Sequence, residues 1–182
     1  DLVELARGDG PGREEEWVDV RLDDLVRRAV DRSRRHSSGI HFETDCEPSV
    51  VHGEAELMSR ALANVLDNAC KWSPPGSVIE VSSHDGEVVV RDHGPGIDPA
   101  DLPHIFDRFY RAPAARSMPG SGLGLSIVAR VMQSHHGVAI AETAADGGAC
   151  FRLRFPTAAD GLEPDAAADP PGETDPVPLQ AP

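Results

Sequence analysis

The chain has few cysteines and no long hydrophobic run. Its 182 residues contain three widely spaced cysteines, Cys46, Cys70 and Cys150, and no CxxC pair. This set excludes a disulfide framework and a CxxC zinc site, and it fits a reducing compartment. No apolar stretch approaches the roughly 18–20 residues needed to span a bilayer, and the acidic beginning is unlike a signal peptide. We therefore expect a cytoplasmic location and no direct membrane contact.

Basic residues are also scarce, because 17 Lys and Arg face 31 Asp and Glu, for a net charge of −14. Such an acidic surface repels the phosphates of nucleic acids and anionic lipids, so we expect no nucleic-acid partner. A few local donors can still hold a nucleotide in an acidic protein. Lys71 is the only lysine in the chain.

Turn signals and composition divide the chain into three parts. Residues 1–12 resemble the last turns of a helix followed by a Gly/Pro linker, and residues 13–156 alternate between helix and strand patterns. Residues 157–182 carry six acids, no base and no aromatic side chain. Because such a tail cannot bury enough apolar surface to offset its chain entropy, we predict that it is disordered.

The central part predicts an α+β fold, a two-layer α/β sandwich with helices packed on one face of a mixed sheet. Asp85 and Gly86 mark a hairpin turn, and the prolines Pro74 and Pro75 end a long helix. The expected strands are 16–20, 40–45, 78–83, 87–92, 138–144 and 150–156. The expected helices are 23–35, 54–72, a short one within 100–111, and one that follows the glycines at 120–124.

Three polar side chains follow one row along the long helix. Asn64, Asn68 and Lys71 are spaced at i, i+4 and i+7 and lie at the edge of the apolar face. Buried polar groups without partners cost about 1–3 kcal/mol, so these side chains need a ligand or nearby loops. Taken alone, the row fits a polar helix margin as well as it fits a binding site.

Two glycine motifs follow. In "RDHGPGID", Asp92 comes at a strand end and is followed by Gly94 and Gly96, so a fixed carboxylate could accept from an exocyclic amine. Alone, this motif fits an ordinary turn better. In "GSGLGLSIV", glycines precede a helix N-terminus, which leaves N–H groups free for a phosphate. The spacing matches neither a P-loop nor a Rossmann fingerprint.

Their combination and order are more specific. N-x-x-x-N-A-x-K-W-S at 64–73, D-x-G-x-G at 92–96, F-x-R-F-x-R at 106–111 and G-x-G-x-G at 120–124 resemble the N, G1, F and G2 boxes of sensor histidine kinases, especially actinobacterial ones of the MprB type. The resemblance covers roughly residues 16–156. It implies the Bergerat ATP-binding fold, with ATP and Mg²⁺ as ligands. It also implies transfer of the γ-phosphoryl group to a histidine of a dimerisation domain, a response regulator downstream, and a full-length parent anchored in the cell membrane.

The resemblance also implies residue roles. Asn64, Asn68 and Lys71 would be catalytic: Asn68 would bind Mg²⁺, Asn64 would order the water ligands of the metal, and Lys71 would contact phosphate. Trp72 would stack on adenine and Asp92 would accept from its amino group. Asn64 stands where the related ATPases place a general-base glutamate, which fits a kinase that does not hydrolyse ATP. The remaining expected nucleotide contacts are Gly94, Gly96, Ile97, Arg108, Phe109, Arg111, Arg116, Gly120, Ser121, Gly122, Leu123, Gly124 and Leu125. Phe106 and Phe109 would pack the base of a mobile lid at about residues 107–120.

One family feature is absent, since none of the eight histidines has the sequence context of a phosphoacceptor. Surface histidines such as His84 and His135 are not expected to reach the phosphate. The chain is therefore interpreted as the catalytic half of a kinase, or a truncated or orphan one. Two alternatives stay open: a catalytically silent ATP-binding regulator, and a serine kinase of the anti-sigma-factor type on the same fold.

Overall fold

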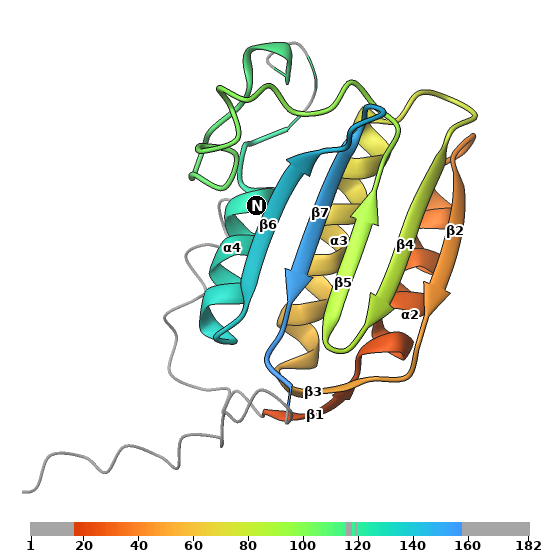
Figure 1. The fold of residues 1–182 in the computed structure, drawn as a ribbon, viewed down its shortest axis with the longest axis vertical. Coiled ribbons are helices and arrows are strands. Elements are labelled where there is room, and N and C mark those ends of the chain that lie inside the picture. Colours follow the sequence, from red (N-terminus) through yellow and green to blue (C-terminus); the bar gives the residue numbers. More distant parts are fainter. Residues whose placement is uncertain (1–16, 116–117, 119, 158–182) are drawn as a thin grey trace, which may run out of the picture.

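A computed structural model of the chain describes residues 17–115, 118 and 120–157. These residues form a mixed sheet, a small two-stranded ribbon and three α-helices (Figure 1). In order, the elements are β1 (Val18–Arg21), α2 (Leu22–His36), β2 (His41–Cys46), β3 (Val50–Gly53), α3 (Ala55–Trp72), β4 (Val78–His84), β5 (Glu87–Arg91), the 3₁₀ turn η1 (Pro113–Ala115), α4 (Gly124–Ser134), β6 (Val138–Thr143) and β7 (Ala149–Arg154).

The main sheet has the strand order β2-β4-β5-β7-β6. β2 runs parallel to β4, and every other neighbouring pair is antiparallel. β1 and β3 pair separately, with Val18 opposite Gly53. The three α-helices cover one face of the sheet (Figure 1). The predicted class, a two-layer sandwich with helices on one face of a mixed sheet, is confirmed.

The alternation of side chains along the strands explains this one-sided packing. Apolar residues on one face of the sheet and along the helices form the core, including Ile79, Val81, Val88, Val90, Leu62, Val65, Phe151 and Leu153. The other face of the sheet is exposed. It carries ion pairs, such as Arg152 with Glu142 and Glu87, beside the apolar side chains of Val138 and Ile140. The sheet therefore buries one face only, and its strand ends are free to carry loops.

Two local predictions were incomplete or wrong. β3, only four residues long, was not expected from the sequence. The prediction of a short helix within residues 100–111 is wrong, because this stretch forms a series of turns. His104 donates its backbone N–H to the Asp101 carbonyl and Asp107 donates to His104. Pro103 has no N–H to donate, and Phe109 has a φ of 64°, so a continuous helix cannot form.

None of the helices among the described residues is long and apolar enough to cross a membrane. The expected helix end and linker at 1–12 lie outside the described residues, as does nearly all of the acidic tail.

Candidate functional site

A cavity of about 1030 Å³ opens between α3, the end of β5 and the segment that leads into α4. Its walls come from parts of the sequence that are far apart. α3 contributes one row of side chains, the loop after β5 contributes residues 95–101, and the glycine-rich segment contributes residues 120–125. The cavity brings together these predicted site residues: Asn64, Asn68, Lys71, Trp72, Asp92, Gly96, Ile97, Arg111, Gly120, Ser121, Gly122, Leu123, Gly124 and Leu125.

Asp92 supplies a carboxylate at the inner end of this cavity. It follows β5 directly and is fully buried. Its Oδ1 accepts hydrogen bonds from the backbone N–H groups of Gly94 (2.8 Å) and Ala149 (3.1 Å). Its Oδ2 is buried and has no hydrogen-bond partner within the described ranges. Because an unpaired buried acceptor is costly, Oδ2 is suited to a donor from a ligand in the cavity.

Positive charge gathers elsewhere on the cavity wall, at Lys71 and Arg111. Burial, together with the nearby charge of Arg111, lowers the pKa of Lys71. No carboxylate of the described residues pairs with Lys71. A Cβ added at Gly120 would lie 3.1 Å from Lys71 Nζ, so the ammonium group sits against the glycine-rich backbone. This part of the cavity is suited to an anion.

Arg111 has a second task. Its guanidinium donates to the carbonyl oxygens of Ala115 and Met118, which braces the segment between the F-x-R-F-x-R motif and the glycines. Arg111 therefore shapes the segment over the cavity as well as adding charge to it.

Two asparagines from α3 face the start of α4. Asn64 donates its amide N–H to the Arg60 carbonyl oxygen (3.0 Å), which leaves Oδ1 for other partners. Gly124, the first residue of α4, approaches Asn64 so closely that a Cβ there would lie 3.1 Å from Oδ1. Asn68 lies one turn further along α3 and lines the same cavity. One amide oxygen thus stands beside the glycine-rich helix start, and a second amide lines the same cavity.

Gly122 requires the absence of a side chain. It has a φ of 73°, and a Cβ there would lie 2.8 Å from the carbonyl oxygen of Tyr110. Its own carbonyl oxygen accepts from the Phe109 N–H at 3.0 Å. This contact joins the segment of Phe109 to the glycine-rich segment, so the two predicted motifs form one structural unit.

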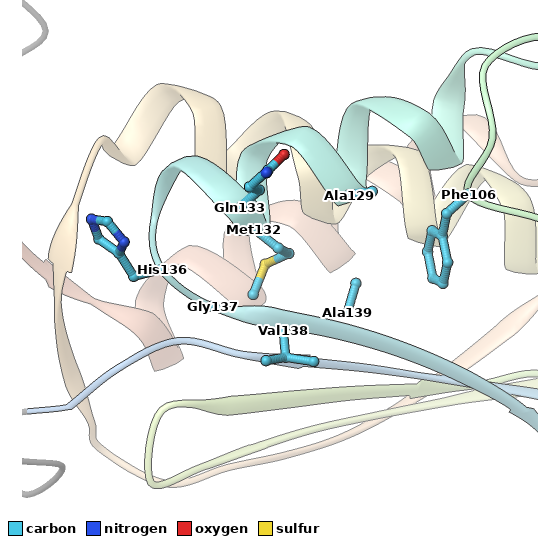
Figure 2. A pocket seen from close by; sticks show the side chains of 8 residues that line it. All are labelled: Phe106, Ala129, Met132, Gln133, His136, Gly137, Val138 and Ala139. Atoms are coloured by element: carbon cyan, nitrogen blue, oxygen red, sulfur yellow. The ribbon is translucent and has the colours of Figure 1, made fainter.

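Three of the predicted residues that the structure describes, Gly94, Arg108 and Phe109, do not line the cavity. Gly94 lies behind it, where a Cβ would clash with the Trp72 carbonyl at 2.6 Å. Arg108 and Phe109 point to solvent, and Phe109 is 61% exposed. Arg116 is outside the described residues. Phe106, expected to pack beneath a lid, lines a separate hollow of about 470 Å³ between α4 and β6 (Figure 2).

Sequence reasoning missed several cavity residues, among them Arg60, Asp67 and Tyr110. Arg60 and Asp67 extend the row of Asn64 and Lys71, at i−4 and i+3 from Asn64, so helical spacing could have found them. Burial raises the pKa of Asp67, although the charge of His36 lowers it. Tyr110 donates its hydroxyl to Asp101 at 2.7 Å. No short-range pattern indicated that contact.

A one-sided sandwich with a buried unpaired carboxylate oxygen and a cationic, glycine-rich wall in one cavity defines a nucleotide-binding α+β domain. The sequence pattern of the histidine kinase-, DNA gyrase B- and HSP90-like ATPase family matches residues 53–159. The chain belongs to this family of ATP-binding domains.

Known proteins that resemble the chain agree with this assignment. The signal transduction histidine-protein kinase/phosphatase MprB of Mycobacterium avium is 46% identical over 154 residues, which is 81% of this chain and 29% of that protein. The solved structure of a mycobacterial sensor histidine kinase MprB has a TM-score of 0.70 at 38% identity, and the match covers 78% of this chain and 97% of that one. The crystal structure of full-length ShkA in complex with AMPPNP has a TM-score of 0.68 at 26% identity. That match covers 85% of this chain and 34% of the ShkA chain. The matched part of the chain thus spans about 30% of the length of these curated relatives.

Proposed function

We propose that this chain is the catalytic domain of a two-component sensor histidine kinase. It would bind ATP with Mg²⁺ and transfer the γ-phosphoryl group to a histidine on a dimerisation domain. A response regulator would then receive the phosphoryl group. As in the interpretation of the sequence, the full-length parent would be anchored in the cell membrane.

The observation that carries the proposal is the unpaired Oδ2 of Asp92 inside the cavity. An adenine amino group would satisfy it, since a carboxylate oxygen only accepts. Trp72 lines the same cavity and offers an aromatic face to the base, and Lys71 and Arg111 supply the positive charge that phosphates require. One ligand with a base at one end and phosphates at the other would use both ends.

The side chains of the cavity also fit Mg²⁺ bound together with phosphates. The described residues contain no cluster of three or more His, Cys, Asp or Glu that could hold a metal by itself. Mg²⁺ commonly takes one or two protein ligands, several waters and substrate phosphates. Asn68 would hold the ion and Asn64 its waters, and the ion would supply neutralising charge beside the phosphates.

The protein would act mainly by positioning and charge neutralisation. Gly120–Gly124 and Lys71 would hold the phosphates, and Arg111 would brace the segment above them. The row from α3 has amides at positions 64 and 68, and no carboxylate stands at position 64 to activate water. This favours transfer to a protein over hydrolysis.

The acceptor histidine would come from another domain. None of the eight histidines has the sequence context of a phosphoacceptor, and His135, expected at the surface, is 1% exposed. That expectation for His135 was wrong.

Asn68→Ala tests the nucleotide site. The change removes an amide oxygen from a half-buried position without opening a large apolar cavity, so we expect an unchanged fold and a loss of Mg²⁺-dependent affinity of at least about tenfold. A titration with a fluorescent ATP analogue measures it, and Asp85→Asn in the exposed β4–β5 turn is the control. Equal affinity of Asn68→Ala and wild type would remove Asn68 from the site.

Transfer is tested with γ-labelled ATP and a separate dimerisation domain that carries a phosphoacceptor histidine. We expect acid-labile, alkali-stable label on the added domain and none on this chain. Nucleotide binding without any transfer would favour a silent regulator. Acid-stable label on a partner serine would favour a serine kinase, and label on a histidine of this chain would contradict the proposal.

A further inference from the structure

One buried ring, His135, ties the end of α4 to the start of α3. Its Nε2 accepts the backbone N–H of Glu54 at 3.0 Å, and its Nδ1 lies 2.8 Å from the carbonyl oxygen of Val131. Because a carbonyl oxygen only accepts, Nδ1 carries the proton and the ring is the neutral Nδ1–H tautomer. The ring therefore satisfies the orphan N–H of Glu54 at the start of α3. On its other side it adds a third donor to the Val131 carbonyl oxygen, which also accepts from the backbone N–H of His135 (3.1 Å) and the hydroxyl of Ser134 (2.9 Å).

Neighbouring groups leave this ring little room to turn or shift. Trp17 stacks on it with ring centroids 5.0 Å apart and planes inclined by 21°, and Phe155 meets it edge-on at 6.0 Å. On another side, a Cβ added to Gly53 would lie 2.5 Å from Cδ2 of His135.

The same two helices meet again at the cavity, where Gly124 of α4 packs against Asn64 of α3. His135 lies 11 residues after Gly124 and Glu54 lies 10 residues before Asn64, so the two contacts are about 15 Å apart along antiparallel helices. In Figure 2, Phe106 and His136 mark the two ends of α4. A small slide of α4 along α3 at one contact would therefore displace the other.

We propose that His135 is a positioning residue for the nucleotide site, and that the stacked ring of Trp17 holds it in place. The inference rests on the proposed nucleotide function. Withdrawing Trp17 frees the ring to turn away from Glu54, and α4 then loses its fixed register on α3. Gly120–Gly124 no longer stand at the right distance from Asn64 and Lys71. Loss of the Trp17 stack would thus weaken the affinity for nucleotide.

Affinity and stability must be measured separately in the full chain. We compare wild type with Trp17→Ala, the conservative Trp17→Phe, and Val50→Ala, a control that is 49% exposed on β3. Thermal melts identify a temperature at which all four proteins are folded, and a fluorescent ATP analogue with Mg²⁺ is titrated there. We expect Trp17→Ala to bind the ATP analogue at least about fivefold more weakly than wild type, because typical couplings between sites change affinity by about fivefold or more. Trp17→Phe and Val50→Ala should stay within about twofold of wild type, because a phenyl ring keeps the stack.

The outcomes separate the two proposals. Wild-type affinity in a folded Trp17→Ala overturns this inference alone, and a wild type that binds no nucleotide overturns the proposed function and this inference with it.

The coupling between Trp17 and the nucleotide site is also reciprocal. In wild type labelled with 5-fluorotryptophan, one of the two ¹⁹F signals is assigned to Trp17 by its loss in Trp17→Phe, and saturating Mg-ATP should shift that signal. That measurement decides the question if Trp17→Ala does not fold, and an unchanged Trp17 signal at saturating Mg-ATP contradicts the coupling. ¹⁵N NMR should show a protonated Nδ1 and a bare Nε2 on His135, and the opposite tautomer would overturn its role.

Discussion

Asp92 divides its two carboxylate oxygens between structure and ligand. Oδ1 is held by two backbone N–H groups, which fixes the carboxylate, and Oδ2 has no partner among the residues that the structure describes. The fixed geometry leaves Oδ2 one use, to accept from a donor on a ligand. Adenine presents an amino group where guanine presents a carbonyl, so this oxygen would select between the two bases.

Asp92→Asn should therefore weaken the binding of ATP more than the binding of GTP. Hydrogen bonds to charged groups contribute roughly 1.5–3 kcal/mol, so we expect a loss of ATP affinity of at least about tenfold. The affinities of both nucleotides for wild type and variant are measured by competition, with Asp85→Asn as control. If wild type binds ATP and GTP equally well, Asp92 does not read the base.

His136 adopts a conformation that favours glycine. It follows the end of α4 with a φ of 53°, and the backbone N–H groups of His136 and Gly137 bond to the carbonyl oxygens of Gln133 and Met132. This is the left-handed position that commonly ends a helix. His136→Gly should raise the free energy of unfolding by about 0.5–1 kcal/mol, while His136→Ala should not. Urea denaturation compares the free energies of unfolding of the two variants. Equal values would show that the backbone conformation of residue 136 is not strained.

At the scale of elements, the junction of β1 and α2 is held by a buried carboxylate. Asp23 accepts from Arg21 at 2.9 Å and from Arg27 at 3.0 Å, and its side chain is 1% exposed. The hydrogen bond from Arg21, with the charges of both arginines, lowers the pKa of Asp23 to about 2. Arg27 also donates to the carbonyl of Cys46, which ties the end of β2 to the same point.

The sign of the pH dependence follows from this lowered pKa. The unfolded chain titrates near its ordinary value of about 3.9, so the stabilisation from Asp23 is fully present above that pH and is lost as the pH falls through about 2. Asp23→Asn should be clearly less stable than wild type at pH 7, and the difference should shrink between about pH 4 and pH 2. Urea unfolding at both ends of this range measures it. Asp24→Asn, whose carboxylate is half exposed and 3.7 Å from Arg27, is the matched control. A difference that stays constant with pH would contradict the assignment.

At the scale of the whole molecule, the segment over the cavity has little core of its own. Residues 107–115 contain only the short η1 turn, and Phe109 is exposed. Polar contacts help to hold them: Phe109 donates to Gly122, Tyr110 to Asp101, and Arg111 to the carbonyls of Ala115 and Met118. Few buried contacts give low local stability. We expect fast hydrogen exchange at 107–115 without nucleotide and clear protection with Mg-ATP, whereas β5 and β7 should be protected in both states. Equal protection of 107–115 in the two states would contradict a lid that closes on the nucleotide.

The sequence by itself determined the one-sided sandwich, the long helices and the order of the four motifs, because helical and strand periodicity and glycine spacing are local signals. The row of Asn64, Asn68 and Lys71 was visible for the same reason. Tertiary structure decided the rest. It added β3, whose four residues form a strand only by pairing with β1, and replaced the expected helix at 100–111 with turns. It also showed that Oδ2 of Asp92 is unpaired and that His135 is a buried link between helices. Burial and hydrogen-bond partners depend on segments far apart in the chain, which no short stretch of sequence specifies.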